Sequence, residues 1–115
     1  MTPTTRPPAW AVLEQGLLKR RPVQASYHGH LRLLCPHALG WKNGRAKVLA
    51  YQAGGESSHG PLTAEPTQRW RSMFIDGLKE VVTTDQPWQT ADNYIPDPSG
   101  IFDRIALHVQ PRDIK

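Results

Sequence analysis

WKNGRA, residues 41–46, is the stretch that decides the fold. Asn43 and Gly44 form an Asn-Gly pair, which supplies the positive φ angles of a tight type I′ turn between antiparallel strands. Residues 46–52 leave this turn with strand-like composition, and we expect the strand to end at the small residues 53–55. The stretch therefore predicts a β-hairpin in the middle of the chain.

A second hairpin is expected just before this one. Apolar and polar residues alternate over residues 23–28, and the pattern resumes after Gly29 over residues 31–35. A period of two residues is typical of a half-buried strand. Further strands or strand ends are expected at residues 70–75, 78–82 and 101–109, the second with a helical turn as the alternative. Apolar residues on both faces of the first of these predict burial on both sides.

One helix is expected ahead of the strands. Trp10, Leu13 and Leu17 recur at helical spacing within residues 9–21, and polar residues fall off that face. Gly16 lies inside this segment and weakens the helix by about 1 kcal/mol relative to alanine. The pattern predicts an amphipathic helix that packs on the sheet.

Length and composition limit the fold class. A chain of 115 residues forms one domain, and its eleven Pro and nine Gly leave little room for long helices. We expect a mainly β protein, a small bent antiparallel sheet or an SH3- or Sm-like barrel, with one N-terminal helix. Residues 1–8 are expected to be a flexible segment and residues 9–115 the single domain; the sequence leaves open whether residues 53–68 and 83–100, both loop-like, are ordered.

The compartment is expected to be the cytoplasm. The chain has one cysteine, Cys35, the usage typical of a reducing environment. No apolar run approaches the roughly 20 residues of a membrane span, and residues 1–8 lack the apolar stretch of a secretory signal. We therefore expect no membrane partner.

The positive charge of the chain is concentrated in its first half. Residues 1–50 hold eight Lys and Arg against one acid, a net +7, and residues 51–115 hold six against nine, a net −3. Such a block attracts phosphate-rich or acidic partners, although it could equally be a solvated face that keeps the protein dispersed.

Basic and aromatic residues form the candidate binding site. Cations that follow phosphates and aromatic faces that stack on bases are the means by which proteins hold single-stranded nucleic acid. The alternative is that the aromatic residues fill the core and the cations are solvated. The candidate ligand or nucleic-acid residues are Arg32, Arg45, Lys47, Arg69, Arg71, Tyr51 and Trp41, with Lys42 beside them at the turn.

The sequence gives little support for an enzyme. His28, His30, Cys35 and His37 carry zinc-type ligands, but their spacing lacks the closely paired ligands of a structural zinc site. No catalytic motif surrounds Cys35 or the serines, and a buried apolar role is favoured for this cysteine. We expect no catalytic residue, no metal and no cofactor.

Residues 22–82 resemble a WYL domain. The resemblance rests on residues 22–27, 31–36 and 43–45, followed by Leu49-Ala50-Tyr51 and the pattern Arg71, Met73, Ile75-Asp76 and Leu78. It covers about two thirds of the chain, including the preceding helix. The resemblance implies an Sm- or SH3-like barrel that binds nucleic acid or a nucleotide-like ligand in a regulatory or accessory role, with an arginine at position 71 on the ligand surface. No winged-helix domain precedes it here, so a stand-alone module is expected and not a repressor of the usual layout.

Two functions remain open at this point. The first is a non-catalytic module that binds single-stranded nucleic acid or a nucleotide-like anion. The second is a module that binds a partner protein or a second copy of itself through its sheet edges and loops.

Overall fold

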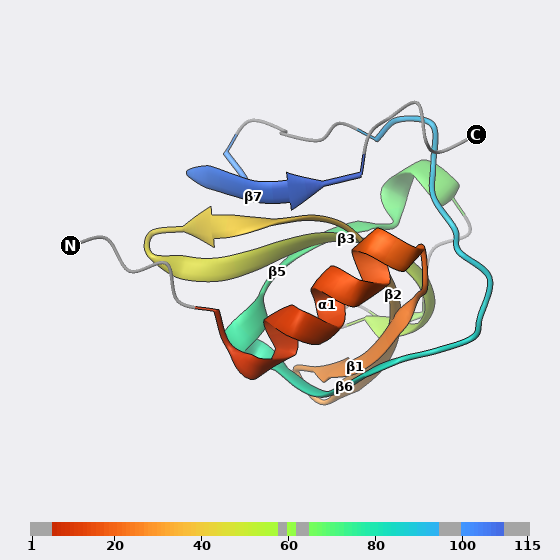
Figure 1. Cartoon of the computed structure of the whole chain (residues 1–115). Helices are drawn as coiled ribbons and strands as arrows, with labels where there is room; N and C mark the ends of the chain where they lie inside the picture. Colours follow the sequence, from red (N-terminus) through yellow and green to blue (C-terminus); the bar gives the residue numbers. More distant parts are fainter. Residues whose placement is uncertain (1–5, 58–59, 62–64, 95–99, 110–115) are drawn as a thin grey trace.

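A long β-hairpin forms the centre of the computed structural model, which describes residues 6–57, 60–61, 65–94 and 100–109 (Figure 1). Strands β2 (His30–Lys42) and β3 (Arg45–Ser57) are joined at Asn43 and Gly44, whose φ angles are 53° and 77°. Both residues have the left-handed backbone of a type I′ turn. The predicted turn is confirmed.

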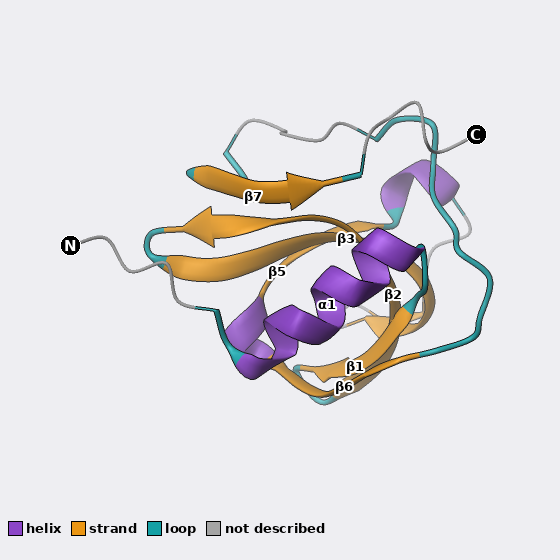
Figure 2. Cartoon of the chain, viewed as in Figure 1, coloured by secondary structure: helices purple, strands orange, loops and turns teal. Residues whose placement is uncertain are grey.

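Antiparallel pairing extends this hairpin on both sides into one bent sheet. The main strand order is β4-β3-β2-β1-β6, while β5 pairs with β3 and β7 pairs with β2. The remaining strands are β1 (Val23–Tyr27), β4 (Gly60–Pro61), β5 (Trp70–Phe74), β6 (Leu78–Thr83) and β7 (Arg104–His108). The two 3-10 turns are η1 (Pro66–Gln68) and η2 (Ile75–Gly77). Because η2 directly links β5 and β6, which lie on opposite sides of the hairpin, the sheet is strongly bent (Figure 2). The expected fold class is confirmed.

The N-terminal helix α1 (Pro8–Lys19) crosses one face of this sheet (Figure 1). Its first residue is a proline, which suits the first turn, and the helix ends where Arg20 adopts a left-handed conformation with φ 55°. Trp10, Leu13 and Leu17 are buried against the strands, as their spacing predicts. The helix is slightly shorter than expected because the left-handed cap precedes Pro22.

The end of β3 differs from the prediction. The strand continues through the glycines to Ser57, and Gly54 and Gly55 pair with Leu33 and Arg32 of β2. Gly55 has φ 87°, and a Cβ there would lie 2.3 Å from the Leu31 carbonyl oxygen. The glycine lets two strands approach closely, so it continues the strand where the sequence indicates an end.

Of the two alternatives for residues 78–82, a helical turn or a strand end, the structure shows a strand, β6. β5 was expected to be buried on both sides, but it pairs only with β3, and Met73 is its one fully buried residue. An edge strand with a single inward face explains this pattern.

The sheet carries a cluster of buried side chains on each face. The main cluster joins α1 to the strands and includes Leu34 and Ala50. Cys35 and Tyr51, neighbours of those residues along β2 and β3, point the opposite way and pack with Ala91 of the segment after β6. Residues 84–94, drawn as loop in Figure 2, therefore cover the outer face of the sheet instead of leaving it to solvent.

Candidate functional site

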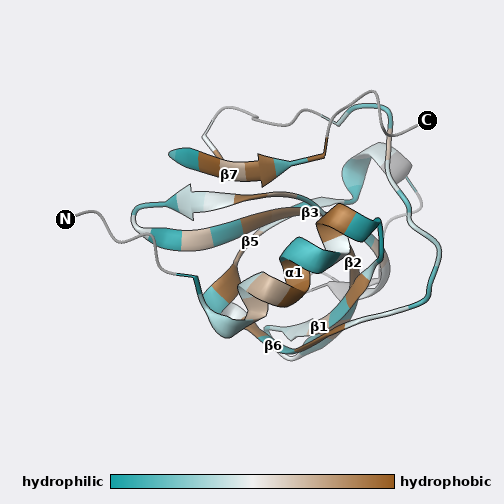
Figure 3. Cartoon of the chain, viewed as in Figure 1, coloured by the Kyte–Doolittle hydropathy of each residue, from teal (hydrophilic) through white to brown (hydrophobic). Residues whose placement is uncertain are grey.

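Three cations and a phenylalanine share the outer face of the sheet at the end of the central hairpin. Lys42 and Arg45 are cross-strand partners beside the turn, and Lys47 lies two residues further along β3 on the same face. Phe74 of β5 is the cross-strand partner of Lys47. We call Lys42, Arg45, Lys47 and Phe74 the basic hairpin patch; Figure 3 shows the hydrophilic colour of this hairpin end.

The phenylalanine ring supports two of these cations. The guanidinium carbon of Arg45 lies 3.8 Å from the ring centre of Phe74, and the Lys47 ammonium nitrogen lies 5.0 Å from it. Both distances are within the range of a cation–π contact. The ring thus holds two positive charges together on the surface.

Two aspartates border the patch. Asp76 accepts hydrogen bonds from Nε and Nη2 of Arg45 at 3.1 and 2.7 Å, which lowers the pKa of this carboxyl. Asp103 lies 3.2 Å from the Lys42 ammonium and accepts a 2.7 Å hydrogen bond from the backbone N–H of Asn43. These bonds, the backbone one first, lower its pKa too. The aspartates fix the positions of two cations at the surface.

Lys47 is the patch cation whose positive charge is disfavoured by its surroundings. Partial burial lowers its pKa, and the positive charge of Lys42 lowers it further, while Asp103 opposes the shift. The ammonium therefore lies in a partly desolvated position next to a like charge. An anion bound between Lys42 and Lys47 would relieve this repulsion.

Arg32 and Arg71 do not belong to this patch. Arg32 is 4% exposed and lies on the inward face of β2, with its guanidinium carbon 5.3 Å from the ring centre of Tyr27. Arg71 follows Trp70 on β5, and its side chain is on the same face as the buried Met73. The charge of Arg71 contributes to lowering the pKa of Arg32, after burial, so the two are close to each other. The predicted cations thus separate into two groups on opposite faces.

The side chain of Arg71 is already engaged by its own strand. Its Nη1 donates to the carbonyl oxygens of Gln68 and Trp70, both at 2.9 Å. Arg69, the other cation beside Trp70, is half-buried, and its carbonyl oxygen accepts a hydrogen bond from Gln52 N–H. The two hydrogen bonds of Arg71 hold its guanidinium against the backbone at the start of β5, apart from the basic hairpin patch.

The two aromatic residues expected to stack on a ligand are buried. Trp41 is 5% exposed and stacks on Trp10 of α1, with ring centres 5.1 Å apart. Tyr51 is 2% exposed and contacts the Trp70 ring edge-to-face. Both belong to hydrophobic clusters, so the expectation that they present a face to a ligand is wrong for this structure.

His28, His30, Cys35 and His37 are the zinc-type ligands that the sequence brings close together in the chain. Among the described residues, no group of three or more His, Cys, Asp or Glu side chains is placed to hold a metal ion. Cys35 is fully buried, which raises the pKa of its thiol to about 11. His37 is also fully buried and points into a cluster with Trp70 and Trp88. The predicted burial of the cysteine is confirmed.

Phe74, Asp76 and Asp103, which contact the cations of the patch, could not be identified from the sequence alone. Phe74 was placed correctly on its strand, but its partnership with Lys47 depends on the pairing of β3 with β5. The two aspartates lie 31 and 61 residues from the cations they contact. The one available signal was the Asn-Gly turn, which predicts that Lys42 and Arg45 face each other.

Comparisons with known proteins identified no relative of this chain. No protein-family model matches the chain, and neither the curated proteins nor the solved structures contain a match to it. Within the residues that the structure describes, no helix has the length and apolar character that a membrane crossing requires.

Proposed function

We propose that this protein is a non-catalytic, cytoplasmic module that binds single-stranded nucleic acid or a nucleotide-like anion through the basic hairpin patch. The observation that carries the proposal is the placement of Arg45 and Lys47 on one partly buried aromatic ring, that of Phe74, with Lys42 beside them. Cations with this spacing follow phosphates, and the ring edge offers a surface for a base. The resemblance of residues 22–82 to WYL domains implies the same class of ligand, although it implies a ligand surface that includes Arg71.

Only some of the binding residues expected from the sequence belong to the proposed site. Lys42, Arg45 and Lys47 contact phosphate, and Phe74 supplies the aromatic surface in place of Trp41 and Tyr51. The ion pair with Asp76 uses Nε and one Nη of Arg45, so its second Nη lies outside that pair. A phosphate can bind there without breaking the ion pair.

The test is a titration of a labelled oligothymidylate at several salt concentrations. We expect binding that weakens steeply between about 50 and 200 mM salt, because phosphate contacts release counterions. Lys47→Ala should weaken binding and reduce the slope of log K against log salt by about 0.7, the value for one phosphate contact on a single strand. Lys79→Ala is the matched control, because Lys79 is an exposed lysine on β6, separated from β3 in the sheet by β1 and β2.

Two further variants separate the two faces. Phe74→Leu should weaken binding because it removes the ring under the cations, whereas Arg71→Ala should leave binding unchanged. If Arg71→Ala weakens binding and Lys47→Ala does not, the ligand lies on the opposite face, as the WYL resemblance implies. If the wild type binds no tighter than a neutral control protein at low salt, nucleic acid is the wrong ligand.

A further inference from the structure

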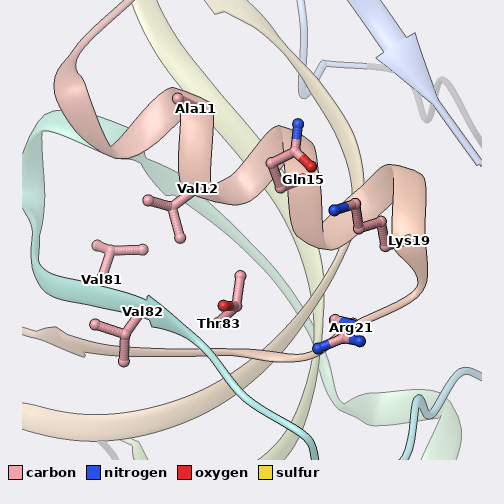
Figure 4. Close-up of a pocket in the computed structure, with 8 residues that line it drawn as sticks. All are labelled: Ala11, Val12, Gln15, Lys19, Arg21, Val81, Val82 and Thr83. Carbon is pink, nitrogen blue, oxygen red and sulfur yellow. The ribbon is translucent and has the colours of Figure 1, made fainter.

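A groove runs between α1 and β6, and one of its ends reaches Asp76, the aspartate that binds Arg45 of the basic hairpin patch. Two adjoining hollows of about 610 and 520 Å³ form it, and both are lined by Val12 of α1 and Val81 of β6. Figure 4 shows these two valines pointing toward each other across the first hollow, with Val82 and Thr83 further along the strand. The centre of the groove is therefore apolar.

The two ends of the groove carry opposite charges. Lys19 and Arg21 line the end at the C-terminus of α1, as Figure 4 shows. Asp76 and Glu80 line the other end, near the start of the helix. In the described part of the chain, neither Lys19 nor Glu80 makes an ion pair with another residue. A second copy that binds in the opposite direction matches both charged ends, because its basic end then faces the acidic end of this groove.

Exposed apolar side chains flank the same groove. Leu18 of α1 is 58% exposed and Val82 of β6 is 51% exposed, and they are two of the three large apolar residues that the described structure leaves exposed. Ala11, Gln15 and Leu18 are spaced four and three residues apart and form an exposed stripe along the helix.

The backbone of β6 is too irregular to pair with an added strand. The pairing of β1 with β6 is irregular between Gln24 and Ser26, and Glu80 within this irregularity has φ 53°. A bulge of this kind disrupts the row of backbone groups that an extra strand requires. The groove is therefore better suited to a helix than to an extended peptide.

We propose that the occupant is helix α1 of a second copy of this chain, bound about a two-fold axis. Antiparallel α1 helices place Lys19 of each copy at the acidic end of the groove in the other, and the two helix dipoles also oppose each other. The exposed stripe of each helix fills the apolar centre of the partner's groove. This contact does not depend on the proposed nucleic-acid binding.

The test is the oligomeric state of the full chain, measured by sedimentation equilibrium over a range of concentrations. We expect the wild type to dimerise and Leu18→Glu to raise the dimer Kd about tenfold or more, a change of at least 1.4 kcal/mol. Leu31→Glu is the matched control, because Leu31 is 53% exposed but lies on β2 away from the groove. A thermal melt of each variant checks that its fold is retained.

Charge reversal distinguishes a second copy from any other partner. Lys19→Glu should weaken the dimer, and combining it with Glu80→Lys should restore it, because each copy then carries both reversals. A monomeric wild type at every concentration overturns the proposal, whatever other protein binds the groove. Equal weakening by Leu18→Glu and Leu31→Glu, or a double reversal that fails to restore the dimer, also overturns it.

Discussion

Nε2 of His37 lies 2.8 Å from the hydroxyl oxygen of Thr90, although 53 residues separate the two in the chain. The other ring nitrogen, Nδ1, lies 2.7 Å from the carbonyl oxygen of Cys35. A carbonyl can only accept, so Nδ1 donates, and Nε2 of the neutral ring accepts from the threonine. The histidine is thus a fully buried link between β2 and the segment that covers the outer face of the sheet.

This link predicts that acid destabilises the protein through His37. Burial lowers the pKa of His37 to about 4, against an ordinary value of 6.5. Between these values the unfolded chain binds a proton that the folded protein does not, so stability falls as the pH drops from 6.5 to 4. The loss attributable to this histidine is about 3 kcal/mol.

Chemical denaturation of wild type and His37→Gln at several pH values measures this effect. The difference in their free energies of unfolding should be largest at neutral pH and shrink as the pH approaches 4. Thr90→Val, which removes the hydroxyl donor, should lower stability at neutral pH. A wild-type advantage over His37→Gln that stays constant across this range would contradict the prediction.

Gly44→Val should destabilise the protein by about 1 kcal/mol or more. A β-branched residue tolerates the φ of 77° at this turn poorly. Gly44→Asn is the control and should cost less, because asparagine adopts this conformation more readily. Equal melting temperatures for the wild type and Gly44→Val would mean that the turn contributes nothing to stability.

Leu13→Ala should cost roughly 2 to 5 kcal/mol, because the side chain is fully buried between α1 and the strands. Leu31→Ala, at an exposed leucine, should change stability by less than about 0.5 kcal/mol. Urea denaturation of both variants gives the comparison. Similar small losses in the two would show that the helix is not packed on the sheet in solution.

Gly16→Ala should destabilise the protein, although alanine is the better helix former by about 1 kcal/mol. A Cβ at this position would lie 2.7 Å from Cγ2 of Val23 and 2.8 Å from the Arg21 carbonyl oxygen. Overpacking of this kind costs about 1 to 3 kcal/mol, which exceeds the gain in helix propensity. Thermal melts should show a lower Tm for Gly16→Ala than for the wild type, and Val23→Ala in the same chain should recover part of the loss. A raised Tm would contradict this prediction, because it would mean that α1 moves far enough to relieve both close contacts.

Local interactions explain what could be predicted from the sequence. The Asn-Gly turn depends on the backbone preferences of two adjacent residues, and α1 depends on apolar residues three and four positions apart. Alternation over a few residues predicted strands in β1, the start of β2 and β5. Turns, one helix and the mainly β class therefore follow from contacts within a short window of the chain.

A bulge at His37 decided the inward and outward faces of the central strand. Before it, Leu34 and Pro36 point inward, and after it Leu39 and Trp41 do, so the alternation changes by one residue. One extra residue on one strand reverses every later side chain, and no local pattern reveals it. The bulge therefore decides that Trp41 lies in the core, beside Trp10.

The pairing of β3 with β5 places the predicted cations in two groups on opposite faces of the sheet. The sequence by itself determined that Lys42 and Arg45 face each other across a turn. Only the tertiary structure placed Phe74 beneath Arg45 and Lys47 and turned Arg71 to the opposite face, because those positions depend on the register of β5 against β3. β3 and β5 are distant in the sequence, and their register depends on the packing of the whole sheet, which no segment of the sequence encodes alone.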